Sequence, residues 1–349
     1  MAGQGRAPRA GRGPGARRPD RPPGAVALPG RTAAHRPAFH HRGDSVLNTP
    51  ATPATPTAAL AGRTVLRIGY GALQLERLRD RRDDAVALLR RAVELGVDHV
   101  DTAEFYGFGF ANDVIREVLR PEDDVLVVTK VGAAPDPDGP LPLRLAQRPE
   151  QLRAGVEENL RGLGLDRLPV VNLRRLDSGP GLRPEGDQVV DLEDQLAVLT
   201  ALRDEGKIGA IGLSCVTLDV LRRALPAGIV CVQNAYSLIS RGDEDMLELC
   251  AAEGIAWVPF FPIGGAFPGV PKVTDEPTVR AVAESLGVTP AQVALAWLLH
   301  HAPHVLPIPG TADVAHLEDN MAAAEIAFDA ATLATLDAVE SRSNEVALG

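Results

Sequence analysis

The stretch VDHVDTAEFYG, residues 97–107, decides the fold, because it places a carboxylate directly after a short apolar run. Residues 97–100 read as a buried strand, and the carboxylate of Asp101 at its end would be costly to bury without a partner. Tyr106 follows five residues later. This arrangement raises the question of which group neutralises Asp101 and why a tyrosine lies so close to it.

The rest of the chain repeats the succession of a short apolar run and a helical pattern. Eight runs rich in β-branched residues read as buried strands, and the amphipathic stretches between them are long enough for helices. We predict strands at residues 65–69, 98–100, 125–130, 170–173, 208–213, 229–234, 255–259 and 305–309, and helices at 84–95, 149–160, 191–205, 246–253 and 290–300.

Eight strand and helix pairs within about 285 residues match the order and length of an α/β fold, the (β/α)8 TIM barrel. A doubly wound open sheet is the competing architecture. Its glycine fingerprint is absent after the first predicted strand, because IGYGALQL, residues 68–75, lacks the third glycine and opens no helix. We therefore expect a single barrel domain at residues 61–349.

Composition limits where the protein works and what it binds. Of the 349 residues, 45% are apolar and 23% charged, which is ordinary for a soluble protein with a large core. No apolar run approaches the roughly 18 residues that would cross a bilayer, and no secretory signal follows the N-terminal arginines, so we expect a cytoplasmic protein without a membrane partner. Cys215, Cys231 and Cys250 lack the paired spacing of a zinc or redox site, so we expect reduced packing residues and no metal.

Residues 1–60 form a separate region that is rich in Pro, Gly, Ala and Arg. Residues 1–43 contain nine arginines and one acid, Asp20, so they carry +8 of the total charge of −10 and leave −18 for the rest. A body this acidic does not suit nucleic acid. The leader has no apolar periodicity and is expected to be disordered. It is an inert tail, a transit peptide, or the result of a start codon assigned too early, with the real chain beginning near Val46.

Active sites of this fold lie at the carboxyl ends of the strands, so the residues there are candidates for the site. Each polar residue at such an end is by itself more typical of a solvated loop than of a catalyst, but together these residues converge on one face. The eight predicted strands lead to Gly71, Asp101, Lys130, Arg174, Ser214, Gln233, Phe260 and Gly310.

Asp101, Tyr106 and Lys130 can act together as a proton-donating group. An ammonium group next to a phenol stabilises the phenolate and lowers the pKa of the phenol, and a carboxylate orients and balances the ammonium. We therefore expect Lys130 to neutralise Asp101 and to make Tyr106 a proton donor. The alternative is an ordinary buried ion pair with a tyrosine nearby.

Aromatic residues are scarce but concentrated after two of the predicted strands. They make up only 4% of the chain, yet two short windows hold eight of them. Aromatic side chains at a barrel mouth suit a flat ring, although packing within the loops is the simpler interpretation for any one of them. The two windows contain Phe105, Tyr106, Phe108 and Phe110, and Trp257, Phe260, Phe261 and Phe267.

Five separated motifs give the sequence a resemblance to the aldo-keto reductase superfamily over residues 65–341. They are DTAEFYG (101–107), VVTKVG (127–132), GLSCV (212–216), VQNAYS (232–237) and IPGTADVAHLEDN (308–320). The resemblance implies that a nicotinamide cofactor lies across the barrel mouth and passes hydride to a carbonyl carbon, while Tyr106 protonates the oxygen. It implies Asp101, Tyr106 and Lys130 as catalytic residues.

Arg174 is a departure from the family pattern, which has a catalytic histidine at this strand end. The stretch VVNLRRLD, residues 170–177, puts an arginine there, which still donates hydrogen bonds to a carbonyl oxygen but cannot transfer a proton as neutral histidine does. VVNLR (170–174), together with VPFFPIGG (258–265) and VQNAYS (232–237), is similar to a bacterial branch that includes pyridoxal reductases. We therefore count Arg174 as the fourth catalytic residue and expect a small carbonyl substrate, an aldehyde on an aromatic ring.

The resemblance also implies a set of cofactor-binding residues and NADP as the cofactor. NAD stays an alternative, because there is no Lys or Arg between residues 308 and 329 and because Asp313 would repel a 2′-phosphate. Cys215 also replaces an asparagine of the family. The implied cofactor contacts are Ser214, Gln233, Phe260, Pro262, Gly264, Gly310, Thr311, Asp313, His316 and Asn320.

Two functions remain open at this point. The first is a cytoplasmic carbonyl reductase that is a monomer or a weak homo-oligomer. The second is a nicotinamide-binding regulatory subunit of the same fold, which would bind the cofactor without turnover.

Overall fold

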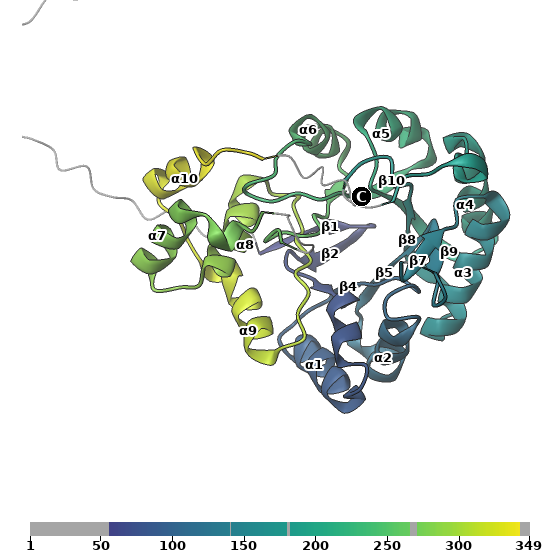
Figure 1. Ribbon diagram of the computed structural model, residues 1–349, viewed down its shortest axis with the longest axis horizontal. Helices are drawn as coiled ribbons and strands as arrows, with labels where there is room; N and C mark the ends of the chain where they lie inside the picture. The colour runs from purple at the N-terminus through teal and green to yellow at the C-terminus, as the bar shows by residue number, and fades with distance from the viewer. Residues whose placement is uncertain (1–55, 140, 180–181, 266–270, 343–349) are drawn as a thin grey trace, which may run out of the picture. The chain divides into compact units, whose positions relative to one another are not determined.

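The centre of the fold is a parallel sheet of seven strands, surrounded by helices (Figure 1). The computed structural model describes residues 56–139, 141–179, 182–265 and 271–342, all of them within one unit, Asn48–Gly349. The sheet has the order β11-β10-β9-β8-β5-β4-β3. Its strands are β3 (Tyr70–Gly71), β4 (His99–Asp101), β5 (Leu126–Val131), β8 (Leu168–Arg174), β9 (Ile208–Ser214), β10 (Ile229–Gln233) and β11 (Ala256–Trp257).

An extended segment after the last of these strands joins the two edges of the sheet. Val305 forms a parallel bridge with Trp257 of β11. On the other side, the amide of Gly69 donates to the carbonyl of Pro307 at 3.1 Å, and that of Gly71 to Pro309 at 3.3 Å. Two prolines in this segment lack the N–H that a regular ladder needs, so the predicted eighth strand closes the barrel without forming a full strand of its own.

Side chains facing the inside of the barrel follow a period of two along each strand. In β5 the inward positions step from Leu126 through Val128 to Lys130, so apolar layers lie below a polar one. The same parity leads from Val170 to Arg174 in β8. One buried cluster fills the lower layers and includes Leu126, Val128, Val170, Cys231, Ala256, Val258, Leu306 and Ile308.

A β-hairpin packs against the inner cluster of the barrel. It changes the predicted boundaries of the first barrel strand and of the N-terminal extension. Strands β1 (Thr57–Leu60) and β2 (Arg63–Leu66) pair antiparallel, and their residues Leu60 and Val65 belong to the same inner cluster. Figure 1 shows this hairpin across the middle of the ring of helices. The prediction of a first barrel strand at 65–69 is therefore wrong, because its β-branched residues pair within the hairpin and β3 supplies the barrel strand.

The expected extension also ends earlier than residue 60. Thr57–Leu60 form β1, since each of these residues pairs with a residue of β2 across a two-residue turn at Ala61 and Gly62, both with positive φ. Residues 1–55 lie outside the described part of the chain.

The helices confirm the predicted alternation, with boundaries shifted by a few residues. A second hairpin, β6 (Ala133–Pro135) with β7 (Leu143–Leu145), follows β5 and was not expected. The helices are α1 (Arg82–Glu94), α2 (Phe110–Val118), α3 (Pro149–Leu163), α4 (Leu192–Asp204), α5 (Leu218–Ala224), α6 (Glu244–Glu253), α7 (Pro277–Leu286), α8 (Pro290–His301), α9 (Val314–Ala322) and α10 (Ala330–Asp337). Short 3-10 helices are η1 (Ala72–Leu78), η2 (Pro121–Asp123), η3 (Gly186–Gln188), η4 (Leu225–Ala227), η5 (Val273–Asp275) and η6 (Ala323–Glu325).

Arg67 ties the beginning of the described chain to its later part. Its buried guanidinium donates to the carbonyls of Leu299 at 2.7 Å, Val305 at 3.0 Å, and Ala302. Burial lowers the pKa of Arg67 to about 10, so the side chain stays charged near neutral pH. The side chain thereby connects the residue that follows β2 to the end of α8 and to the closing segment.

Within the described ranges, no single helix is long and apolar enough to cross a membrane, and α7 and α8 reach that length and composition only as a pair bent by 96°.

Candidate active site

The predicted polar residues gather at the carboxyl ends of neighbouring strands. Asp101 ends β4, Lys130 lies one residue before the end of β5, and Arg174 ends β8. Because these strands are parallel and adjacent in the sheet, their ends meet at one edge. Ser214 pairs with Arg174 in the register of β9, and Gln233 ends β10. The structure therefore brings together the charged groups that the sequence placed on separate strands.

Asp101 and Lys130 form a buried ion pair. Lys130 Nζ lies 2.5 Å from Asp101 Oδ1, and the two side chains are only 4% and 5% exposed. The ammonium also donates to the carbonyl of Thr102 at 3.0 Å. The second carboxylate oxygen, Oδ2, accepts from Gln233 Nε2 at 2.8 Å. Both carboxylate oxygens are thus occupied, as burial of a charged group requires.

Tyr106 lies directly over this pair. Lys130 Nζ is 4.9 Å from the centre of its ring. Tyr106 is partly exposed, yet burial raises the pKa of its phenol, and the nearby charges of Lys130 and Arg174 only partly offset this effect. The prediction that the pKa of Tyr106 is lowered is therefore wrong. Burial disfavours the phenolate more strongly than the positive charges of Lys130 and Arg174 favour it. The phenol stays protonated at neutral pH.

Lys130 stays positively charged in this environment. Burial opposes its charge, but the negative charge of Asp101 and the hydrogen bond to that carboxylate favour it more strongly, so the pKa of Lys130 is raised. The site therefore presents a neutral phenol above a fixed ammonium.

A buried polar network holds the loop that carries Tyr106, and sequence reasoning missed it. Thr102 Oγ1 donates to Asn112 Oδ1 at 2.8 Å, and Asn112 Nδ2 donates to Glu104 Oε2 at 2.6 Å. The same amide nitrogen donates to Asn159 Oδ1 at 3.1 Å. Residues from the loop, from α2 and from α3 are joined in this way. No spacing in the sequence connects them, so only the fold reveals the network.

Arg174 has donor groups available at the mouth of the barrel. Its guanidinium carbon lies 5.3 Å from the centre of the Phe105 ring, within the range of a cation–π contact. No carboxylate of the described residues forms a salt bridge with it, whereas the next residue, Arg175, is paired with Asp177 at 2.7 Å. Arg174 can therefore donate hydrogen bonds to a ligand.

The aromatic windows divide into residues near the site and residues of the core. Phe105 and Tyr106 are in edge-to-face contact with ring centres 5.1 Å apart, and Phe260 contacts Phe261 at 4.9 Å in the same way. Phe108 is exposed at the surface. Phe110 and Trp257 belong to the main hydrophobic core, so the packing interpretation holds for these two, and Phe267 lies outside the described residues.

A cavity of about 320 Å³ opens between the loops that follow β8, β9, β10 and β11. Several loops at this face contain strained backbone, since Phe108, Leu176, Cys215 and Phe261 have φ values between 53° and 62°. Cys215 is one of them, at a position where asparagine would adopt this conformation more readily. The cavity is lined by Ser178, Gly179, Cys215, Ala235, Ser240, Gly242, Asp243, Phe260, Ser341 and Arg342.

The nicotinamide end of the expected cofactor fits the residues around Gln233. Gln233 is fully buried, and its Oε1 has no hydrogen-bond partner among the described residues. A buried acceptor without a partner is costly, and the N–H of a carboxamide would satisfy it. Ser214 Oγ makes only a weak contact with Cys215 Sγ at 3.7 Å, so its hydroxyl is also available. Phe260 offers an aromatic face at the edge of the cavity.

The loop after β11 requires glycine at one of its predicted contact positions. Gly264 has φ of 69°, and a Cβ atom there would lie 2.3 Å from the carbonyl oxygen of Pro271. Gly264 also forms an antiparallel bridge with Lys272, so the backbone is paired at this point of the loop. Pro262 is buried beside it.

The predicted adenosine contacts form a second group, at the closing segment and α9. Gly310 packs so closely that a Cβ atom would lie 2.6 Å from the carbonyl oxygen of Gly71. Tyr70 Oη donates to the carbonyl of Thr311 at 2.8 Å. His316 is exposed on α9, and Asn320 is buried on the same helix.

Asp313 has a structural role that sequence reasoning did not assign. Its Oδ1 accepts from the backbone amide of His316 at 3.0 Å, so it is the N-cap of α9. This hydrogen bond holds the pKa of the exposed Asp313 carboxyl below its ordinary value. The carboxylate thus stays negative near the expected position of a ribose.

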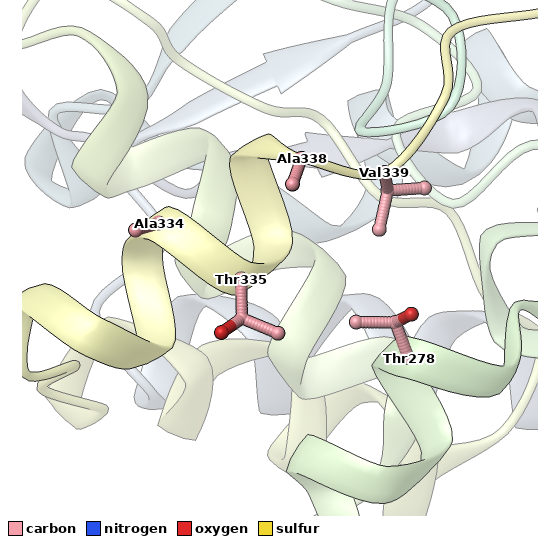
Figure 2. Close-up of a pocket in the computed structure, with 5 residues that line it drawn as sticks. All are labelled: Thr278, Ala334, Thr335, Ala338 and Val339. Carbon is pink, nitrogen blue, oxygen red and sulfur yellow. The ribbon is translucent and has the colours of Figure 1, made fainter.

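Neither a metal site nor a second reactive pocket accompanies these residues in the described part of the chain. No group of His, Cys, Asp or Glu that could hold a metal ion occurs in the described part of the chain. A larger cavity, of about 430 Å³, lies between α7 and α10. Figure 2 shows that small aliphatic and hydroxyl side chains line it, so it contains no acid or base. They are Thr278, Ala334, Thr335, Ala338 and Val339.

Comparisons with known proteins agree with this geometry. Residues 67–341 match the model of the Aldo/keto reductase family. A pyridoxine 4-dehydrogenase from Escherichia coli (strain K12) is 45% identical over 293 residues, which cover 81% of this chain and 98% of that protein.

Solved structures give the same result. An aldo-keto reductase from Klebsiella pneumoniae in complex with NADPH is 28% identical, with a TM-score of 0.67 over 80% of this chain and 93% of that one. A second structure from Klebsiella pneumoniae, in complex with NADP and acetate, is 27% identical, with a TM-score of 0.67 over 83% of this chain and 98% of that one. The chain described here therefore belongs to the aldo/keto reductase family.

Proposed function

We propose that this protein is an NADP(H)-dependent aldo-keto reductase that transfers a hydride to the carbonyl carbon of an aldehyde, with Tyr106 as the general acid. The observation that carries the proposal is the buried pair of Asp101 and Lys130 beneath a protonated phenol. A structural ion pair alone would not need a tyrosine over the ammonium, or near that phenol an arginine that forms no salt bridge with any described residue.

The cofactor would lie along the two groups of residues at the barrel mouth. Ser214, Gln233 and Phe260 would hold its nicotinamide end, and Pro262 and Gly264 its middle. When bound, it supplies the hydride. NADP is supported by the two Klebsiella pneumoniae structures, which contain NADPH and NADP. The adenosine end would meet Gly310, Thr311, Asp313, His316 and Asn320.

Tyr106 delivers the proton in this scheme. It is protonated at neutral pH and donates a hydrogen bond to the carbonyl oxygen before the transfer. Charge develops on the phenol as its proton leaves, and Lys130 stabilises this charge from 4.9 Å below the ring centre. Asp101 holds the ammonium in place, so it acts on the phenol through Lys130.

Arg174 serves as a second donor to the same oxygen. Its position at the end of β8 and its contact with Phe105 hold the guanidinium near Tyr106, and the pKa of Tyr106 is lowered by its charge, though less than burial raises it. Arginine remains charged throughout, so it stabilises an oxyanion without exchanging a proton.

An aldehyde on an aromatic ring is the substrate class that we propose. The Escherichia coli relative at 45% identity is a pyridoxine 4-dehydrogenase, and pyridoxine carries its alcohols on a pyridine ring. Tyr106 and Phe260 are only partly buried, so a flat ring could pack against them, whereas Phe105 is buried and packs edge-on against Tyr106. Three buried free thiols fit a reducing compartment, and we propose the cytoplasm as the location.

The test is reduction of pyridoxal and benzaldehyde, followed by the loss of nicotinamide absorbance with NADPH or NADH. Hexanal, which has no ring, is the matched control substrate, and Tyr106→Phe is the control variant. We expect turnover with NADPH, a preference for the ring aldehydes, and loss of the rate in the variant. If the protein binds NADPH but reduces none of the three aldehydes, it is a cofactor-binding regulatory protein and not a reductase of this class.

A further inference from the structure

The ladder between β5 and β8 stops one residue short of Arg174. Val131 and Leu173 are the last pair in register, and the next residues are Gly132 and Arg174. Gly132 turns away with φ of 104°, and a Cβ atom there would lie 2.3 Å from the carbonyl oxygen of Arg174. The backbones approach closely where the ladder ends. The carbonyl of Gly132 accepts from the backbone amide of Ala146 at 3.0 Å, whereas the carbonyl of Arg174 needs a donor from elsewhere.

Gln147 supplies that donor with its side chain. Its Nε2 donates to the carbonyl of Gly132 at 2.6 Å and to that of Arg174 at 2.7 Å. Gln147 is 1% exposed and lies between β7 and α3, outside both strands. One amide therefore joins the ends of the two strands that carry Lys130 and Arg174.

Neighbouring glutamine side chains fix the orientation of the Gln147 side-chain amide. Gln195 Nε2 donates to Gln147 Oε1 at 2.9 Å and to the Gln147 carbonyl at 2.8 Å. The backbone amide of Gln147 donates to Gln188 Oε1 at 2.8 Å. Rotating the Gln147 amide by half a turn would place its oxygen against two carbonyl oxygens, so only the observed orientation satisfies all partners. Gln195 in turn accepts from Arg175, which follows Arg174 in the chain.

We propose that Gln147 is a positioning residue that sets Arg174 relative to Lys130 and Tyr106. It does not face the reacting atoms, and it acts by holding the main chain from which the Arg174 guanidinium extends. The proposal rests on the proposed function, in which Arg174 binds the carbonyl oxygen. Small displacements of such a donor are costly to the rate, because its hydrogen bond must point to the charge that develops in the transition state.

The kinetic test is a double-mutant cycle with Gln147→Met and Arg174→Met in the full-length protein. Methionine keeps much of the length of glutamine and donates no hydrogen bond. We expect Gln147→Met to lower kcat roughly tenfold, with little change in KM for NADPH, and to move the alkaline limb of the pH profile in the same direction as Arg174→Met. In the Arg174→Met background the same change should have no further effect on kcat.

Gln292→Met is the matched control. Gln292 is also a buried glutamine, and its Oε1 accepts from the Thr289 amide at 2.9 Å in the capping box of α8, away from the site. It should lower the unfolding midpoint while leaving kcat and the pH profile at the parent values. Two results would show that Gln147 only supports stability. One is an equal loss of kcat in Gln147→Met and Gln292→Met, and the other is an equal loss of kcat from Gln147→Met in the parent protein and in the Arg174→Met background.

An NMR measurement that needs no catalytic turnover tests the positioning role of Gln147 separately from the proposed function. The Nε–H resonance of Arg174 would be assigned by its absence in Arg174→Met. It should be shifted by the ring current of Phe105, whose ring centre lies 5.3 Å from the guanidinium carbon. It should move in Gln147→Met and stay in Gln292→Met. An unmoved resonance would overturn the positioning role even in an active enzyme. A parent protein without reductase activity whose Arg174 resonance still depends on Gln147 would instead overturn the proposed function alone.

Discussion

Replacing Lys130 with methionine should destabilise the protein and inactivate it for two separate reasons. The change leaves the Asp101 carboxylate buried with Gln233 as its side-chain partner. Breaking a buried ion pair by removing one member costs about 3–5 kcal/mol, and here both side chains are almost completely shielded from solvent. For a domain of this size, this corresponds to a drop of roughly 10 °C in the melting temperature.

Urea unfolding followed by tryptophan fluorescence measures this loss, because Trp257 and Trp297 are both fully buried. The double variant Asp101→Asn, Lys130→Met removes both charges and should regain at least half of the lost free energy of unfolding. It should stay inactive, because the ammonium beneath Tyr106 is still missing. Stability would then recover in the double variant, while activity would be absent from both variants.

Lys207→Met is the matched control. Lys207 pairs with Glu157 at 2.9 Å, but both side chains are about a third or more exposed, so its loss should cost less than about 1 kcal/mol and leave the rate unchanged. The reasoning is refuted if Lys130→Met unfolds at the same urea concentration as Lys207→Met, or if the double variant is no more stable than Lys130→Met.

Three further variants test the other groups of the site. Tyr106→Phe should lower kcat at least about 100-fold by loss of the general acid, while the Kd for NADPH measured by fluorescence stays the same; turnover at the parent rate would remove Tyr106 from the mechanism. Arg174→Met should lower the rate by roughly 10² to 10³ by loss of a donor to the carbonyl oxygen. Burial raises the pKa of Tyr106 and the charge of Arg174 lowers it, so removing that charge should move the alkaline limb of the pH profile for reduction to higher pH. An unmoved limb would show that Arg174 does not act on the phenol. Asp313→Ser keeps an N-cap for α9 but removes a negative charge, so it should tighten NADPH about fivefold and leave NADH unchanged in parallel titrations; equal effects on both would place Asp313 away from the 2′-position.

The convergence of Asp101, Lys130 and Arg174 could be predicted because it depends only on the direction of the strands. In a parallel barrel all carboxyl ends meet at one face, and a period of two fixes which residue points inward. Errors of one or two residues at a strand boundary do not change this. The predicted pairing of Asp101 with Lys130 followed from charge and position alone.

The remaining features depend on tertiary contacts. Residues 65–69 have the composition of a barrel strand, but β1 offers a partner for Val65 and the barrel takes Tyr70–Gly71 in its place. Gln147 was not predicted, because its partners at residues 132 and 174 are distant in the sequence and belong to a ladder whose end cannot be read from composition. The net pKa of Tyr106 also depends on how much water the folded loops exclude.

The contacts of Arg67 have a consequence for the order in which the chain is synthesised. Arg67 leaves the ribosome early, but the carbonyls of Leu299, Ala302 and Val305, to which its side chain donates, are translated more than 230 residues later. Until then the edges formed by β3 and β11 have no neighbour, and unpaired edges of this kind can join other chains. A nascent chain therefore carries an incomplete barrel through most of translation, and premature termination before residue 305 would release a product that exposes both edges.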